Sequence, residues 1–342
     1  MRLLHHARVR PEYRQAAPAR GRFAAASFGR RTAMTGIKVG LIGVGNMGQP
    51  MALRLLEQGV DLTVCDRNPE ALKPLVAQGA QVAEDPLDMA NRCELIIASM
   101  PSRDASLAVA LGERGVVGGS ALRVYVETST LGSAIIDRIA TELRARGIGL
   151  IDAPVSGGPP GARAGTLAVL ASGSEADFAF AHATLDLMAG KLIYLGAKPG
   201  ISQVAKVINN HVSAAGRMAV FEGLAMGVKA GLDPKVLNDV LNAGSGQNYT
   251  TTHKIPAAIL SGTFKYNGPL SIGLKDEALM LEEAQRHGAP LWLAPRILEL
   301  YREAAAAGYR DEDSMKVFLF MQSQSLPDGG AAVAPQWSSE KA

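Results

Sequence analysis

Three spaced glycines at the end of an apolar segment constrain the fold of this chain most. Residues 37–48 read Ile-Lys-Val-Gly-Leu-Ile-Gly-Val-Gly-Asn-Met-Gly, which predicts a buried strand, a tight turn and the start of a helix. In such a turn Gly43 permits the bend, Gly45 lets the backbone approach a pyrophosphate, and Gly48 allows close helix packing. A purely structural glycine turn is the alternative. The predicted cofactor-binding residues of this segment are Gly43, Val44, Gly45, Asn46, Met47 and Gly48.

An acidic residue ends the second apolar segment. Residues 62–65 predict a strand, and Asp66 follows them directly. An acid here accepts hydrogen bonds from the adenosine ribose and repels a 2′-phosphate, which favours NAD over NADP. Arg67 comes next and could pair with such a phosphate, so NADP stays open. We predict that Asp66 and Arg67 contact the cofactor, with a solvated strand end as the alternative.

Strands and helices alternate through the first part of the chain. Further apolar runs predict strands over 94–99, 124–126, 149–152, 167–170 and 192–195, and helical stretches separate most of them. This alternation predicts an α/β Rossmann domain with a doubly wound, mostly parallel sheet.

Short polar or proline-containing segments follow two of these strands. Met100-Pro101 and Ser129-Thr130 lie at the sheet edge where open α/β sheets bind ligands. We predict that Met100, Pro101 and Thr130 line the nicotinamide end of the cofactor. Turn chemistry alone would also account for them.

The pattern changes after Gly196. Apolar residues recur at helical spacing from about 200 to 231, and later helices are predicted over about 253–261, 271–287, 290–307 and 312–324. We predict a dinucleotide-binding domain over 36–198. A long interdomain helix joins it to an all-α substrate and oligomerisation domain over 199–326.

Two terminal segments lie outside this plan. The first 34 residues hold eight arginines and one acid, and residues 327–342 are rich in Gly, Ala and Pro. We predict disorder over 1–35 and 327–342. The arginine-rich segment is typical of a mitochondrial transit peptide, or it reflects a start assigned upstream of Met34. The upstream start is the favoured interpretation and predicts a cytoplasmic protein. A transit peptide would place the protein in the mitochondrial matrix.

Composition argues against several classes of protein. The net charge of +3 comes from the arginine-rich start, and the rest of the chain is slightly acidic, which argues against a nucleic-acid surface. Two cysteines make no disulfide framework and suit a reducing compartment. No apolar run reaches the roughly 18 residues that a membrane span needs. The histidines show no metal-binding spacing, so no metal site is predicted.

A glycine- and proline-rich segment carries a candidate anion site. Residues 152–161 read Asp-Ala-Pro-Val-Ser-Gly-Gly-Pro-Pro-Gly, a composition that predicts a loop and excludes a helix over 156–161. The Ser156 hydroxyl and the N–H groups of Gly157 and Gly158 can bind a carboxylate without adding a competing charge. We predict that these three residues bind the substrate; an ordinary Gly/Pro connection is the alternative.

Lys206 and Asn210 share one face of the predicted long helix, because residues four apart are neighbours on a helix. Most helical lysines are solvated, but apolar residues flank Lys206 on both sides. A lysine there must reach a polar cleft or a partner. A redox cofactor, an anion-binding loop and a helical lysine together predict proton-coupled hydride transfer beside a carboxylate, with Lys206 as general acid and base.

Taken in order, these motifs resemble the β-hydroxyacid dehydrogenase family over about residues 37–325. The resemblance rests on the glycine turn, on 152–158, on 164–167, on 206–210 and on Lys275-Asp276. It implies oxidation of a small β-hydroxy acid with NAD, or with NADP, by a homodimer or homotetramer. In this family the residue matching Lys206 exchanges the proton, and those matching Ser156, Gly157, Gly158 and Asn210 hold the substrate. The residues matching the family's other cofactor contacts are Met100, Pro101, Thr130 and Lys275.

The chain departs from the family pattern around the substrate pocket. Met100, Ser202 and Glu277 stand where the family usually has Leu, Gly and Leu. These changes bear on the substrate more than on the reaction. An imine or other carbonyl reductase is the first alternative, although such reductases generally lack the lysine matching Lys206. A protein that binds NAD(P) without chemistry is the second.

Overall fold

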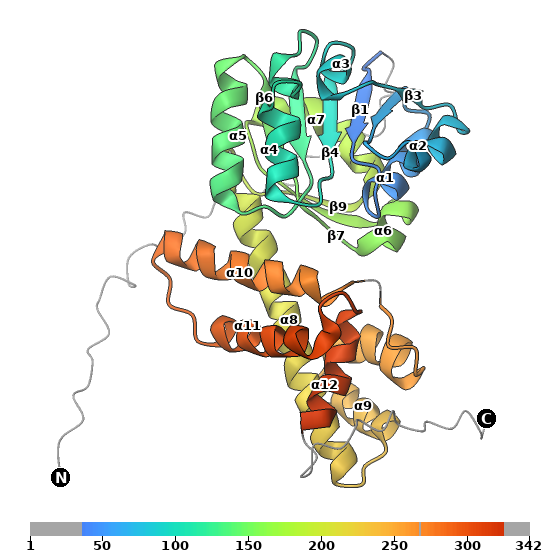
Figure 1. The fold of residues 1–342 in the computed structure, drawn as a ribbon, viewed down its shortest axis with the longest axis vertical. Helices are drawn as coiled ribbons and strands as arrows, with labels where there is room; N and C mark the ends of the chain where they lie inside the picture. The colour runs from blue at the N-terminus through green and yellow to red at the C-terminus, as the bar shows by residue number, and fades with distance from the viewer. Residues whose placement is uncertain (1–35, 267, 325–342) are drawn as a thin grey trace, which may run out of the picture. The chain divides into compact units, whose positions relative to one another are not determined.

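The structure is a computed structural model that describes residues 36–266 and 268–324 (Figure 1). The disorder predicted for 1–35 and 327–342 therefore lies outside the described residues. Within the described ranges, no helix has both the length and the apolar character that crossing a membrane requires.

Six parallel strands form the predicted sheet, in the order β3-β2-β1-β4-β5-β6. Every residue of β1, β2, β4 and β5 is buried, which agrees with their largely apolar sequences, because helices cover both faces of such a sheet. The strand order reverses between β1 and β4, the point at which doubly wound sheets bind ligands. The strands are β1 (Val39–Ile42), β2 (Leu62–Cys65), β3 (Gln81–Val82), β4 (Leu95–Ala98), β5 (Val124–Glu127) and β6 (Gly149–Asp152).

Two apolar cores hold the helices to the two faces of this sheet. Side chains of a strand point alternately to opposite faces. Leu41 of β1 thus joins a core with Met51 of α1, whereas Ile42 joins another with Ile136 of α5. The helices of this region are α1 (Gly48–Glu57), α2 (Pro69–Val76), α3 (Pro86–Ala90), α4 (Arg103–Leu111), a 3₁₀ helix (Val116–Gly118), α5 (Ser133–Ala145) and α7 (Glu175–Met188).

A second, three-stranded sheet contains β7 (Val155–Ser156), β8 (Leu167–Ala171) and β9 (Ala189–Tyr194). The prediction that residues 156–161 exclude a helix is wrong, because α6 spans Gly158–Ala164. Its two prolines lie in the first turn. There the N–H groups have no acceptor within the helix, so proline removes no hydrogen bond.

After Gly200 the regular secondary structure of the described chain is entirely helical, apart from one isolated β-bridge between Pro269 and Asp313. This confirms the predicted all-α region. Phe221, Tyr301 and Phe318 are fully buried in its core. The helices are α8 (Ile201–Lys229), α9 (Pro234–Ala243), a π-helix (Thr250–Leu260), α10 (Leu270–His287), α11 (Leu293–Ala304), a π-helical turn (Ala305–Tyr309), a 3₁₀ helix (Ser314–Lys316) and α12 (Val317–Gln324).

The long helix α8 contacts both regions of the chain. Near its start it packs against α5 and β8, and further along it packs against α10, α11 and α12 (Figure 1). Because α8 belongs to both sets of contacts, the domain boundaries at 36–198 and 199–326 stay predictions.

Candidate active site

Two of the three fingerprint glycines are required by the fold itself. Gly43 has φ +86°, and a Cβ there would overlap the carbonyl oxygen of Ser99. A Cβ at Gly48 would overlap the carbonyl oxygen of Gly43. A Cβ at Gly45 would meet nothing within 4 Å. Packing therefore does not explain Gly45, and open space beside its backbone fits the approach of a pyrophosphate.

Asp66 ties the glycine turn to the end of β2. Its Oδ2 accepts a hydrogen bond from Val44 N at 2.8 Å, and its Oδ1 accepts one from Asn68 N at 2.8 Å. Arg67 beside it is exposed. The predicted residues thus meet at one end of the sheet, and their contact with a ribose stays a prediction.

The predicted nicotinamide residues lie on two adjoining loops that follow β4 and β5. Met100 N donates a hydrogen bond to Ser129 Oγ at 2.7 Å, which joins these loops. Lys275 of α10 donates a hydrogen bond from Nζ to Thr130 O at 2.9 Å. Pro101 is exposed at the rim. Thr130 and Lys275, far apart in sequence, are therefore in direct contact.

Lys206 is only 7% exposed, on the second turn of α8. Burial lowers the pKa of its ammonium group to about 8; neighbouring Lys275 lowers the pKa further, while Asp276 opposes the shift. Among the described residues, no carboxylate lies within 4.0 Å of Lys206 Nζ. A lysine with this pKa can both accept and donate a proton near neutral pH.

Asn210 faces α10 from the next turn of α8. Its Nδ2 donates a hydrogen bond to Asp276 Oδ2 at 2.8 Å. Lys275 Nζ lies 3.2 Å from the other oxygen, Asp276 Oδ1. Asn210 and Lys275 thus meet at Asp276, and the charges of Lys275 and Asp276 also act on Lys206.

The Ser156–Gly158 segment lies at the end of β7 and the start of α6. Ser156 is half-buried, and Gly157 and Gly158 both have positive φ, at +129° and +64°. Among the described residues, no hydrogen bond links this segment to Lys206 or Asn210. A substrate shared between them stays a prediction.

A buried polar network behind these loops was missed by the sequence reasoning. Glu127, Asp152 and Gln203 are each 0% exposed, and they connect β5, β6 and α8. Burial raises the pKa of Asp152 to about 7, and burial also raises the pKa of Glu127. The available signal was a glutamine in an apolar helix, one turn before Lys206.

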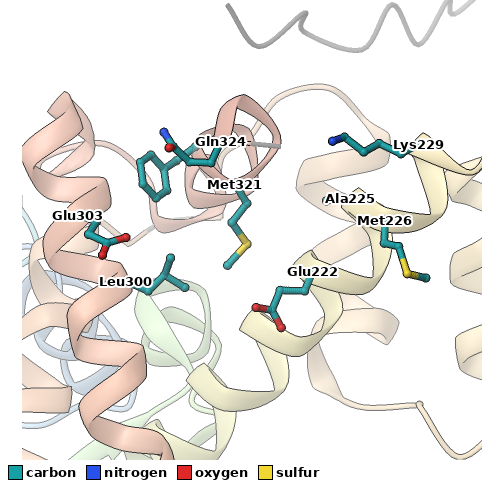
Figure 2. A pocket seen from close by; sticks show the side chains of 9 residues that line it. Glu222, Ala225, Met226, Lys229, Leu300, Glu303, Met321 and Gln324 are labelled. Atoms are coloured by element: carbon teal, nitrogen blue, oxygen red, sulfur yellow. The ribbon is translucent and has the colours of Figure 1, made fainter. Parts of the chain in front are cut away.

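One hollow of the described structure lies away from these residues. It has a volume of about 590 Å³ and opens between α8, α11 and α12 (Figure 2). Met321 and Glu222 face each other across it, and Leu300, Glu303 and Met226 also line it (Figure 2). None of the predicted site residues lines it, so it is not part of the candidate site.

Two family models match consecutive parts of the chain. Residues 38–196 match the NAD-binding domain of 6-phosphogluconate dehydrogenase. Residues 200–320 match the model described as NAD-binding of NADP-dependent 3-hydroxyisobutyrate dehydrogenase.

Relatives match nearly the whole described chain. Human mitochondrial 3-hydroxyisobutyrate dehydrogenase is 33% identical over 321 residues, which covers 91% of this chain and 94% of the human protein. The 2-(hydroxymethyl)glutarate dehydrogenase of Eubacterium barkeri is 33% identical, over 86% of this chain and 98% of the relative. The structure of Mycobacterium tuberculosis 3-hydroxyisobutyrate dehydrogenase matches with a TM-score of 0.75 and 28% identity, over 84% of this chain and 99% of that one.

A Rossmann-type sheet with its glycine turn, followed by an all-α region that presents a buried lysine, defines an NAD(P)-dependent hydroxyacid dehydrogenase. The chain belongs to the β-hydroxyacid dehydrogenase family. Its cofactor is NAD(P), and its substrate is a small hydroxy acid.

Proposed function

We propose that this protein reversibly oxidises a small β-hydroxy acid to its semialdehyde or keto acid, with Lys206 exchanging the proton. The observation that carries the proposal is the burial of Lys206 beside Asn210, Lys275 and Asp276. A solvated structural lysine would have neither this burial nor a pKa lowered to about 8.

The reaction balances with one hydride and one proton. Bound NAD(P) supplies the hydride acceptor, C4 of the nicotinamide. In oxidation, neutral Lys206 takes the proton of the hydroxyl as its carbon loses hydride; in reduction, the ammonium group returns that proton. Positioning the reactants contributes on the order of 7–11 kcal/mol to such catalysis, and general acid–base help roughly 10²–10⁴-fold.

The substrate's carboxylate is assigned to Ser156, Gly157 and Gly158, with Asn210 fixing the carboxylate or the hydroxyl. Positive φ at both glycines fits a turn that presents N–H groups. The Mycobacterium tuberculosis relative was solved with L-serine, which carries a carboxylate and a β-hydroxyl. The human and Eubacterium barkeri relatives are named for hydroxy acids of the same pattern. These relatives support the substrate class and leave its side chain open.

We assign NAD as the preferred cofactor, with NADP accepted. The carboxylate of Asp66 at the end of β2 would repel a 2′-phosphate, whereas exposed Arg67 could bind one. Asp66→Ser is expected to shift the ratio of kcat/KM for NADP over NAD upward. A ratio that does not change would remove Asp66 from cofactor selection.

We infer a homodimer or homotetramer. Large apolar side chains on α8 and α9 are exposed, with Val212 at 64%, Met226 at 69% and Val240 at 60%. Light scattering after size-exclusion chromatography measures the assembly.

We place the protein in the cytoplasm, or in the mitochondrial matrix if residues 1–34 are a transit peptide. Fractionation of cells distinguishes the two locations.

One assay tests the reaction. Purified protein is supplied with C3–C6 hydroxy acids, and separately with cyclic imines, in the presence of each nicotinamide cofactor, while absorbance of the reduced cofactor is followed. Turnover of β-hydroxy acids that disappears in Lys206→Ala, with NADH binding retained, supports the proposal. Turnover of imines alone, or NADH binding without any turnover, contradicts it.

A further inference from the structure

Gln203 joins the helix that carries Lys206 to the loop that follows β5. Its Oε1 accepts hydrogen bonds from Leu131 N at 2.8 Å and from Gly132 N at 3.1 Å. Its Nε2 donates to Ser129 O at 3.1 Å. One fully buried side chain therefore fixes both ends of the loop that presents Thr130.

Asp152 holds Gln203 from the neighbouring strand β6. Its Oδ1 accepts from Gln203 Nε2 at 2.6 Å, and its Oδ2 accepts from Gly200 N at 3.1 Å. Gly200 immediately precedes α8, so the carboxylate also anchors the start of that helix. Gln203 Nε2 and Gly200 N both depend on the carboxyl oxygens of Asp152 as acceptors, because burial leaves no water to replace them.

Glu127 continues the network toward the loop that follows β4. Its Oε1 accepts from Ser129 N at 2.9 Å, and Ser129 Oγ accepts from Met100 N. Glu127 and Asp152 are paired across β5 and β6. A continuous path of hydrogen bonds thus runs from Met100, through Ser129 and Gln203, to the first turn of α8.

Lys206 follows Gln203 by three residues, which is about one helical turn, or roughly 4.5 Å along the axis. A shift at Gln203 is therefore passed to Lys206 with little loss, since an α-helix is stiff over one turn. The loop at the other side of Gln203 contains Thr130, the acceptor for Lys275 Nζ.

We propose that Gln203, held by Asp152, is the positioning residue that sets Lys206 against the nicotinamide-side loop 129–132. The inference rests on the proposed function, because it assigns the geometry of that same proton transfer. Gln203 itself exchanges no proton with substrate and is not a catalytic residue.

Several charged groups surround this network. Glu127 on β5 is the other carboxylate near Asp152. On the far side of the loop, Arg103 Nε donates to Leu131 O, and Glu283 of α10 accepts from Ser133 N and Oγ. None of these groups hydrogen-bonds Gln203 within the described ranges, so the Gln203–Asp152 pair can be changed without replacing them.

The test is Gln203→Glu, which keeps the size of the side chain and adds one titratable proton. When protonated, the new carboxyl can donate to Asp152 and accept from the two loop N–H groups, and it loses only the second bond that the amide donates, to Ser129 O. When ionised, it faces Asp152 across the 2.6 Å contact, and two carboxylates at that spacing share one proton. Turnover of the variant is therefore expected to fall as pH rises.

Wild-type oxidation, in contrast, is expected to rise with pH as Lys206 becomes neutral. At high pH the variant should lose on the order of 10²-fold in kcat, the cost of a misplacement of about 1 Å. Its NADH dissociation constant, measured by fluorescence, should stay within about twofold of wild type. Loss of NADH binding in parallel with kcat would indicate a general folding defect and overturn the positioning role.

A double variant distinguishes loss of the Gln203–Asp152 hydrogen bond from simple misfolding. In Asp152→Asn combined with Gln203→Glu, the asparagine can donate to the new carboxylate, so the hydrogen bond is reversed rather than broken. This double variant should recover at least tenfold of the lost kcat at high pH and regain the wild-type direction of the pH profile. Recovery supports coupling of the pair even where the single variant does not fold, and no recovery contradicts it.

Gln285→Glu is the matched control, because Gln285 is exposed on α10. It should leave kcat and its pH profile unchanged. A Gln203→Glu enzyme that keeps the wild-type profile would overturn this inference while leaving the proposed function intact. A wild-type protein that turns over no hydroxy acid would overturn both.

Discussion

Lys275 donates a hydrogen bond to the carbonyl of Thr130, although 145 positions separate the two residues in the chain. The contact joins α10 to the loop after β5. It places the Lys275 ammonium group at the edge of the predicted nicotinamide site. The helical region and the sheet therefore both contribute residues to the predicted site.

Removing this contact should weaken cofactor binding. Lys275→Met is expected to raise the dissociation constant of NADH about tenfold, because the charged donor that Lys275 is predicted to offer the cofactor is lost. Fluorescence titration measures the change. Lys235→Met is the control, since Lys235 is exposed on α9, which packs against α8 and the π-helix Thr250–Leu260. Equal affinities for both variants would exclude Lys275 from the cofactor site.

The pH dependence should have opposite signs in the two directions of reaction. The pKa of Lys206 is lowered to about 8, chiefly by burial. Oxidation needs the neutral amine and should accelerate as pH rises through about 8; reduction needs the ammonium form and should slow over the same range.

Profiles of kcat at saturating substrate and cofactor test this in each direction. Lys206→Arg keeps the charge but does not lose its proton in this range, so it should remove the alkaline rise of oxidation. Two profiles of the same sign would refute proton exchange by Lys206.

Burying Lys206 should also cost stability. Its pKa is about 8 in the folded protein against 10.5 for a free lysine, so the folded state binds fewer protons between these values. The free energy of unfolding attributable to this group therefore rises with pH through that window, and the full penalty applies below it. The shift corresponds to about 3 kcal/mol.

Lys206→Met should accordingly lower turnover by roughly 10²–10⁴-fold and raise Tm at pH 7 by a few degrees. The gain in Tm should shrink at pH 10, where wild-type Lys206 is already neutral. Calorimetry at both pH values measures it. Inactivation without any gain in Tm would mean that Lys206 is less buried than 7% exposure indicates.

Local patterns were enough to predict the parallel sheet and the helical region, and they nominated the residues of the candidate site, which stay predictions. Apolar runs and the glycine turn depend on neighbours in sequence, so the positions of β2 and β6 followed directly. Gln203 shows what such patterns miss. Its hydrogen-bond partners lie 51 to 74 positions away in the chain, so no local spacing predicts them. They are Ser129, Leu131, Gly132 and Asp152.

The helix α6 was missed for a different physical reason. Proline and glycine content argued against any helix over 156–161, yet Pro159 and Pro160 occupy the first turn of α6, where proline is tolerated. Gly157, at φ +129°, makes the preceding bend that lets this helix begin. The position of the two prolines within the helix, rather than the composition of the segment, therefore determines that a helix can form here.

Two glycines of the fingerprint should respond differently to the same substitution. A Cβ at Gly48 would overlap the carbonyl oxygen of Gly43. Gly48→Ala should therefore destabilise the fold by about 1–3 kcal/mol, the usual cost of overpacking. A Cβ at Gly45 would meet no atom within 4 Å, so Gly45→Ala should keep its Tm within a few degrees of wild type. Because that space is where we expect the pyrophosphate, Gly45→Ala should bind NADH at least about tenfold more weakly, through steric contact with the ligand. Thermal unfolding without cofactor, together with NADH titration, separates the two effects. Normal NADH affinity in Gly45→Ala would show that the cofactor does not approach this turn.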